Sequence, residues 1–232
     1  MIKILHLYYD LLNLYGENGN IIALKNTLEL NNIPYEISFK TINESYNIND
    51  YDITYLGSGT ETNLLICLED IIKHQEEFKT YIENNKLLIC TGNSNILFGK
   101  SYQTLDKKIH HTLNIFEYES VETSFRTVGE QVYETNLIKE NIIGFLNHQV
   151  SLNNYDSNLF KVITGNGYKP NTNLEGLHYK NFYGTLLIGP FLIRNPYMTN
   201  YILKNYLPNY QEHISPTSIK AYETYLSNFI NN

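Results

Sequence analysis

The 232-residue sequence contains no tryptophan, only two cysteines and no cluster of basic residues. It also lacks any run approaching the roughly 18 apolar residues of a membrane-spanning helix, so no membrane insertion is expected. Lys3, His6 and Asp10 interrupt the apolar start of the chain, and no small-residue cleavage site follows, which argues against a signal peptide. Because Cys67 and Cys90 provide no disulfide framework, we expect a reducing compartment and a cytoplasmic location.

Charge and aromatic content narrow the class of protein further. The formal net charge is −7, and the 17 basic residues are scattered along the chain. The positive surface that nucleic-acid-binding proteins present is therefore missing, and no nucleic-acid partner is expected. The 21 tyrosines and 10 phenylalanines supply large apolar area, so the chain can form a sizeable core despite the absence of tryptophan.

The order of apolar segments in the first hundred residues indicates the fold class. Short apolar runs typical of buried strands lie at 2–8, 35–39, 52–56 and 86–90, and apolar residues at helical spacing lie between them at 21–30 and 64–82. Strands that alternate with helices form parallel sheets covered by helices on both faces. We therefore predict an α/β fold with a mostly parallel central sheet.

Beyond residue 100 the candidate strands lie closer together, which predicts extra antiparallel strands in the second half of the same domain. The candidates are 112–118, 126–133, 142–146, 159–163 and 184–192. A helix is predicted at about 196–206. Ser215 and Pro216 then supply a cap and a first-turn proline for a last amphipathic helix.

The loop after the third predicted strand is the first candidate for a binding site. In open parallel sheets the ligand crevice lies beyond the carboxyl ends of the strands, where Gly57, Ser58 and Gly59 follow residues 52–56. A glycine-rich turn leaves backbone N–H groups free to bind an anion or an oxyanion. The alternative is a tight strand-to-helix turn without a ligand. The motif falls short of a dinucleotide fingerprint, which makes a nucleotide- or flavin-binding module the weaker hypothesis.

Cys90 is the candidate nucleophile. It ends the fourth apolar run, and Gly92 follows two residues later, as in turns that lift a nucleophile out of a sheet. A lone cysteine in an apolar run is also typical of a small buried side chain, and spacing alone leaves both interpretations open. Cys67 lies inside an apolar helical run and is expected in the core.

Five segments together resemble one family, the class I glutamine amidotransferases of the CobB/CobQ-like branch, with GatD subunits the most similar. The segments are YGENGNIIALK at 15–25, DITYLGSGTE at 52–61, LLIC at 87–90, IIGFLNH at 142–148 and GLHYKNFYGTLLIGPFL at 176–192. The resemblance covers residues 1–207 in the family's order. It implies one amidotransferase domain, with 208–232 as a C-terminal amphipathic helix packed on it.

The resemblance also implies roles for individual residues. Cys90 would attack the side-chain amide of glutamine, release ammonia and leave a glutamyl thioester for water to hydrolyse. Backbone N–H groups near the 57–59 loop and Thr91 would stabilise the oxyanion. Arg126 would bind the glutamine carboxylate, since a guanidinium can do so through two hydrogen bonds. Glu17 takes the place of an acidic residue in the family's first loop. Surface exposure for Arg126 and a helix-start charge for Glu17 are the alternatives.

The family resemblance further implies a partner. Subunits of this kind pass ammonia to a Mur-ligase-like protein, MurT, which uses ATP to amidate the D-glutamate of lipid II during peptidoglycan synthesis. ATP and Mg would belong to that ligase. We therefore expect glutamine as the small-molecule partner and no cofactor or metal in this chain.

The sequence departs from the family at two places in the reacting centre. The family's Tyr-Leu-His-Gly-Pro segment reads Leu-Leu-Ile-Gly-Pro at 186–190, so Ile188 stands in place of the catalytic histidine. The family's Cys-Gly-Gly-Tyr-Gln becomes Cys-Thr-Gly-Asn-Ser at 90–94, and the loop to Gly99 is two residues longer. His148 and His178 are possible substitutes for the missing base.

Two hypotheses remain open: a glutaminase with rewired acid–base chemistry, or a pseudo-amidotransferase that binds glutamine or a partner.

Overall fold

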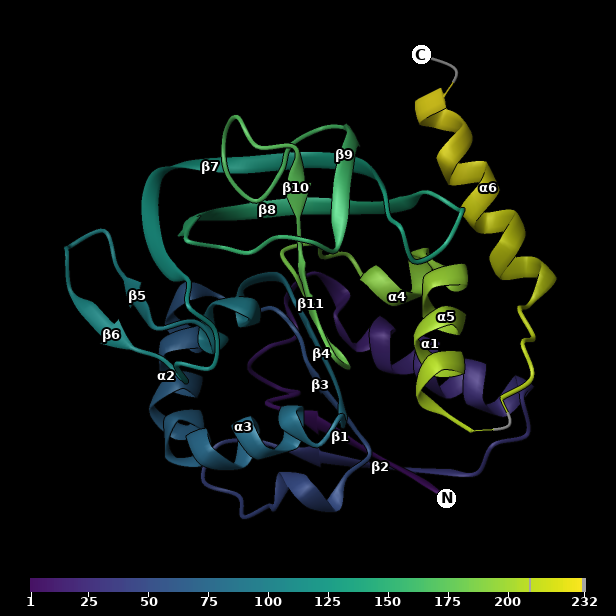
Figure 1. Cartoon of the computed structure of the whole chain (residues 1–232), viewed down its shortest axis with the longest axis horizontal. Helices are drawn as coiled ribbons and strands as arrows, with labels where there is room; N and C mark the ends of the chain where they lie inside the picture. The colour runs from purple at the N-terminus through teal and green to yellow at the C-terminus, as the bar shows by residue number, and fades with distance from the viewer. Residues whose placement is uncertain (209, 231–232) are drawn as a thin grey trace.

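Two six-stranded β-sheets with helices packed around them make up the computed structural model, which describes residues 1–208 and 210–230 (Figure 1). The first sheet has the strand order β11-β12-β4-β3-β1-β2. Its strands are β11 (Leu177–Tyr179), β12 (Phe182–Thr185), β4 (Leu87–Thr91), β3 (Ile53–Leu56), β1 (Ile2–Leu7) and β2 (Tyr35–Lys40). Every pairing in it is parallel except that of β11 with β12. The predicted parallel central sheet is confirmed.

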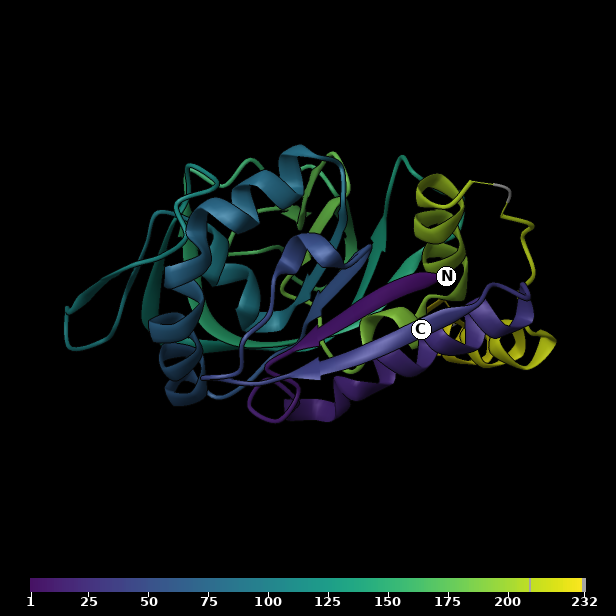
Figure 2. The same cartoon turned by 90° about the horizontal axis from the view of Figure 1, so that it is seen from below.

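Helices cover both faces of this sheet, as the view in Figure 2 shows, with α1 on one side and α2 and α3 on the other. The α-helices are α1 (Asn18–Leu30), α2 (Glu61–Ile71), α3 (Gln75–Glu83), α4 (Phe191–Arg194), α5 (Pro196–Tyr206) and α6 (Pro216–Ile230). Short 3-10 helices are η1 (Leu14–Gly16), η2 (Ile48–Asp50), η3 (Ile72–His74) and η4 (Gly92–Phe98). Because β3 and β4 are covered on both faces, their side chains are all buried, which explains their continuous apolar runs.

The single helix predicted over 64–82 is wrong in one respect, since the chain breaks into α2 and α3 at η3. At His74 the backbone leaves helical geometry, with φ −107° and ψ 16°. The imidazole of His74 stacks on the ring of Tyr46, with 4.7 Å between the centroids. This break lets α3 bury Phe78, Tyr81 and Ile82 in a direction that a straight continuation of α2 would not reach.

The second sheet carries the long strands at the top of Figure 1. Its strands are β5 (Ser101–Gln103), β6 (Ile109–His111), β7 (Glu119–Glu134), β8 (Ile142–Asn153), β9 (Phe160–Thr164) and β10 (Leu174–Glu175). All of its pairings are antiparallel apart from that of β5 with β7. Antiparallel strands in the second half of the chain are therefore confirmed.

One predicted strand of this half is wrong, and another is too long. Residues 112–118 form no strand, because the backbone N–H groups of Leu113, Ile115 and Phe116 donate to carbonyls of η4 instead of to a neighbouring strand. The strand predicted at 184–192 stops at Thr185, since Gly189 turns the chain with φ +85° and α4 begins two residues later.

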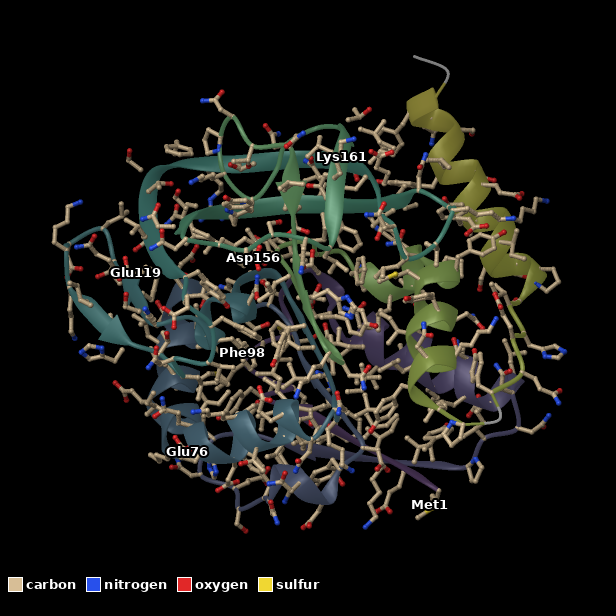
Figure 3. All side chains as sticks on the ribbon, viewed as in Figure 1. Met1, Glu76, Phe98, Glu119, Asp156 and Lys161 are labelled. Atoms are coloured by element: carbon tan, nitrogen blue, oxygen red, sulfur yellow. The ribbon has the colours of Figure 1, made fainter. Side chains whose placement is uncertain are left out.

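Aromatic side chains fill the interior, as the sequence predicted. Phe98, labelled near the middle of Figure 3, is completely buried, whereas Glu76 and Lys161 are exposed. Helix α6 packs Tyr222 against Val132 and Ile143 of the second sheet. The domain boundary predicted at residue 207 stays a prediction, and its C-terminal segment includes residues 209 and 231–232, which lie outside the described residues. Among the described helices, none is long and apolar enough to cross a membrane.

Candidate functional site

A pocket of about 290 Å³ lies beyond the carboxyl ends of β3 and β4, where the sequence predicted a site. Its walls come from the loop after β3, the start of η4 and the β7–β8 strand pair. The polar residues that line it are Tyr15, Ser58, Thr60, Glu61, Asn93, Tyr102, Arg126, Asn147, His148 and Gln149, together with the backbone of Gly59. Two sheets thus contribute to one cavity.

An ion pair forms one end of the pocket. Nη2 of Arg126 lies 3.1 Å from Oε1 of Glu61, a residue in the first turn of α2. The guanidinium also donates to Asn147 Oδ1 at 3.0 Å and to Gln149 Oε1 at 3.1 Å. A guanidinium beside a carboxylate complements the carboxylate and ammonium groups that every free α-amino acid carries. Sequence reasoning singled out Arg126 and missed Glu61, whose only signal was its place at a predicted helix start below a glycine loop.

A β-bulge brings Arg126 to the pocket. The register of β7 against β8 shifts between Glu122 and Thr127, and Arg126 lies in that interval. Bulges bend a strand and redirect side chains, and they are common beside binding sites. The Arg126 side chain retains 38% of its exposure, so its remaining N–H groups can reach a ligand.

The glycine loop is held against the first loop of the chain. A Cβ atom at residue 57 would lie 2.2 Å from the carbonyl oxygen of Leu12, and one at residue 59 would lie 2.7 Å from that of Leu11. Only glycine allows such close backbone approach. Ser58 and Gly59 line the pocket, whereas Gly57 packs under it.

Cys90 lies in the core and not in the pocket. β4 continues through Thr91, so Cys90 does not end its strand but lies in register between Leu56 of β3 and Gly184 of β12. Its thiol is completely buried and contacts Asn95 Oδ1 at 3.8 Å. Burial, with a smaller contribution from the nearby Glu175 carboxyl, raises the pKa of the thiol well above its ordinary value. The structure does not bring Cys90 and Arg126 together.

Gly92 occupies the sharp turn between β4 and η4. Its φ of +62° is left-handed, which is the strained strand-to-helix geometry in which hydrolases carry a nucleophile. A Cβ atom there would lie 2.4 Å from Ser58 Oγ and 2.7 Å from Ile188 Cγ2. Sequence reasoning missed this assignment, although the signal was present: the loop is two residues too long when counted from Cys90, and counting back from Gly99 places residue 92 at the family's cysteine.

Ile188 lies directly beside this turn. Its backbone N–H donates to the carbonyl of Phe145 on β8 at 2.9 Å, and the N–H of Gly92 donates to the carbonyl of Leu187 at 3.2 Å. The side chain is buried, with 2% exposure. The turn and the position of the family's histidine are therefore neighbours, as a nucleophile and a base would be, but one bears no side chain and the other an alkyl group.

The two other histidines lie apart. His148 lines the pocket, and its Nδ1 accepts a hydrogen bond from the N–H of Val150 at 3.3 Å, while Nε2 has no partner among the described residues. Burial lowers its pKa to about 4, which keeps the ring neutral. His178 stacks on Tyr183 at 4.5 Å between centroids and does not line this pocket, and partial burial lowers its pKa. In the part of the chain that the structure describes, no cluster of His, Cys, Asp or Glu could hold a metal ion.

Glu17 joins the loops below the pocket. Its buried carboxyl group accepts hydrogen bonds from Tyr55 at 2.8 Å, from the Thr91 hydroxyl, from the N–H of Gly189 at 3.3 Å and from Asn20 at 3.4 Å. Burial raises its pKa to about 7 despite these bonds. Glu17 and Thr91 therefore position the loops and do not line the pocket.

A profile of the CobB/CobQ-like glutamine amidotransferase domain matches residues 3–196, and the chain belongs to this family. Two relatives make the likeness more specific. The Streptococcus pneumoniae protein named lipid II isoglutaminyl synthase (glutamine-hydrolyzing) subunit GatD is 30% identical, over 95% of this chain and 90% of that protein. The Staphylococcus aureus protein of the same name is 31% identical, over 88% of this chain and 83% of that protein. The chain is thus GatD-like.

Solved structures confirm the fold. The structure of PurLQS from Thermotoga maritima matches with a TM-score of 0.54 at 14% identity, covering 97% of this chain and 99% of that one. The glutaminase domain of Trypanosoma brucei CTPS, solved with bound acivicin, matches with a TM-score of 0.54 at 8% identity and covers 93% and 98%. At these identities the likeness concerns the fold alone.

Proposed function

We propose that this chain is the amidotransferase-type subunit of a two-part lipid II isoglutaminyl synthase, and that its pocket binds glutamine without hydrolysing it through Cys90. The names of the GatD relatives support the place in such an assembly. The family fold supports the glutamine ligand.

The glycine at the turn is the observation that best supports the absence of glutamine hydrolysis in this proposal. Thioester formation requires a sulfur atom within roughly 3.5 Å of the amide carbon and in its thiolate form. Cys90 is fully buried outside the pocket, and its raised pKa keeps it protonated. Gly92 has no side chain, and Ile188 cannot carry a proton. Of the two hypotheses from the sequence, this geometry favours the pseudo-amidotransferase.

The ion pair supports the binding part. Arg126 would take the α-carboxylate of glutamine through two hydrogen bonds, and Glu61 would take the ammonium group. Their separation of 3.1 Å places opposite charges side by side, as they are in the ligand. Ser58 and Gly59 line the same pocket, and we place the side chain of the ligand beside them.

The partner in this proposal is a Mur-ligase-like protein of the MurT type in the cytoplasm, which would hold ATP and Mg and amidate the D-glutamate of lipid II. If this subunit releases no ammonia, the ligase would have to obtain its ammonia from solution or from a second glutaminase. Its contribution would then be to hold the ligase in an active form that depends on glutamine occupancy.

Binding can be tested by isothermal titration calorimetry with L-glutamine. We expect saturable binding that Arg126→Ala weakens by at least about tenfold, because a charge-assisted hydrogen bond contributes roughly 1.5–3 kcal/mol. Lys139→Ala is the matched control, since this cation is 90% exposed and does not line the pocket. Equal affinity in the wild type and Arg126→Ala would contradict the proposed site.

Hydrolysis can be tested by glutamate release from L-glutamine, with a Mur-ligase-like partner present. The wild type and Cys90→Ala should release glutamate at the same background rate. A wild-type rate well above background that Cys90→Ala abolishes would restore the hydrolytic hypothesis.

A further inference from the structure

The carboxamide of Asn93 lines the pocket and lies on the glycine loop. Its Oδ1 accepts from the N–H of Gly59 at 3.0 Å, and its Nδ2 donates to the carbonyl of the same residue at 2.7 Å. A primary amide that pairs with both the N–H and the C=O of one residue occupies its single backbone donor and one lone pair of its carbonyl oxygen. The side chain belongs to the residue directly after the turn glycine.

Ser58 completes this arrangement. Its hydroxyl donates to Asn93 Oδ1 at 3.1 Å, and its oxygen accepts from the backbone N–H of Asn93 at 3.3 Å. The Ser58 Oγ also lies only 2.4 Å from where a Cβ of residue 92 would be, so it fills the volume that a nucleophile's side chain would need. In hydrolases with such a turn, the N–H of the residue after the nucleophile is one of the donors that stabilise the oxyanion.

We propose that Asn93 is an internal carboxamide ligand which, with Ser58, closes the amide end of the pocket and sets its specificity. The N–H of Gly59 and the N–H of Asn93, which would otherwise bind the oxygen of a substrate amide, are both satisfied within the chain. A ligand is then recognised by its α-amino-acid head at Arg126 and Glu61, and its side-chain carboxamide gains no hydrogen bond from this loop.

This inference rests on the proposed amino-acid pocket and adds a prediction that the pocket alone does not make. A site with a free amide end would prefer glutamine to an analogue without the carboxamide. A site closed by Asn93 binds both with similar affinity, because unmade hydrogen bonds provide no discrimination. Removal of the Asn93 side chain frees two donors and one acceptor and creates the preference.

The experiment compares L-glutamine with L-norvaline, which has the same head group and replaces the terminal carboxamide with a methyl group. By calorimetry, the wild type should bind the two within about threefold of each other. In Asn93→Ala and Asn93→Gly, glutamine should bind about tenfold more tightly and norvaline should stay within about threefold, since roughly one to two hydrogen bonds become available. Asn136→Ala, at an exposed position outside the pocket, is the matched control.

The outcomes separate the two proposals. One outcome is that the wild type already binds glutamine about tenfold more tightly than norvaline and that both Asn93 variants lose that preference. In that case Asn93 recognises the ligand, so the inference about Asn93 is overturned and the proposed amino-acid pocket is kept. If neither amino acid binds to any of the proteins, the amino-acid pocket itself fails, and the inference fails with it.

A measurement without ligand gives an independent check. In ¹⁵N-labelled protein the side-chain NH₂ resonances of Asn93 should be dispersed and slow to exchange with solvent, because one proton is held by the Gly59 carbonyl. They should keep their positions when glutamine is added. Rapidly exchanging resonances at random-coil positions would overturn the internal ligand, whatever the calorimetry gives.

Discussion

The ion pair and the neighbouring turn differ in what their polar groups still offer a ligand. Arg126 and Glu61 are side chains with about two fifths of their surface exposed, and both can exchange their mutual contact for a ligand's charges. The closed end of the pocket, defined by Ser58, Gly59, Gly92 and Asn93, offers less, because the N–H groups of Gly59 and Asn93 already have acceptors within the chain.

Under the proposed function, binding and reaction depend on separate parts of the same family fold. The absence of hydrolysis would involve four neighbouring residues: Gly92, Ile188, and Ser58 in contact with Asn93. Substitutions at these residues should leave the Arg126–Glu61 ion pair unchanged, and substitutions at the ion pair should leave the turn unchanged.

The largest expected effect is a gain of glutaminase activity when the closed end is rebuilt. A variant combining Gly92→Cys, Ile188→His, Ser58→Gly and Asn93→Gly restores a thiol and an imidazole and removes the atoms that fill their space. We expect glutamate release to rise by about three powers of ten, because loss of one member of a nucleophile–base pair costs roughly three to six. The control carries Gly92→Ala with the other three changes, and equal rates in the two would contradict the assignment of residue 92.

A stability measurement tests the crowding at the turn. Gly92→Ala should cost about 3 kcal/mol in urea denaturation, since a left-handed alanine is strained by roughly 1–2 kcal/mol and its Cβ overlaps Ser58. In a Ser58→Gly background the cost should fall by about 1–2 kcal/mol. Ser58→Ala should give little relief, because the Ser58 Cβ lies 2.5 Å from the new methyl group. An equal loss of stability from Gly92→Ala in the wild-type, Ser58→Gly and Ser58→Ala backgrounds would contradict the predicted contact with Ser58.

The pH dependence of stability tests Glu17, which joins the loops under the closed end. Burial raises its pKa from 4.5 to about 7, so between these pH values the folded state keeps a proton that the unfolded state has lost. Stability from this group is therefore greatest below pH 4.5 and is lost as the pH rises to about 7. Relative to Glu17→Gln, the wild type should lose roughly 3 kcal/mol over that window.

The comparison of the wild type with Glu17→Gln cancels the contributions of other titratable groups to the pH dependence of stability. His6 and His148, whose burial lowers their pKa values to about 4, make stability rise with pH over part of the same window in both proteins. Glu69→Gln, at an exposed position, is the control and should follow the wild type. A difference between wild type and Glu17→Gln that stays constant with pH would show that the carboxyl is ionised throughout.

The smallest effect is expected at Cys90. Cys90→Ala removes a buried sulfur atom and should cost about 1–2 kcal/mol of stability through the small cavity left behind. Glutamine affinity should stay within about twofold of the wild type, since the thiol does not line the pocket. A large loss of affinity with little loss of stability would place the thiol near the ligand after all.

The parallel half of the fold was predictable from the sequence, and the antiparallel half was predictable only in outline. Buried parallel strands such as β3 and β4 are continuous apolar runs with glycines at their ends. In β7 the 16 residues alternate irregularly between buried and exposed because of a bulge, so only its second part resembled a strand. Hydrogen bonds from Leu113, Ile115 and Phe116 to η4 depend on tertiary contacts that no local pattern encodes.

The sequence predicted the location of the candidate site better than it predicted the residues that form it. The rule that ligands lie beyond parallel strand ends located the loop after β3, and the family resemblance supplied Arg126. It also directed attention to the only cysteine near a strand end, whereas backbone torsion identifies Gly92 as the turn residue. Asn93 had no signal in the sequence, because its role depends on a loop that lies 34 residues earlier in the chain.

The bridge between Phe145 and Ile188 has a mechanical consequence. Strand β8 pairs with β7, which carries Arg126, and through Phe145 it also bridges to the Ile188 segment. We therefore expect a displacement of β8 to move the guanidinium side of the pocket and the turn beside Gly92 together, with no covalent bond made or broken.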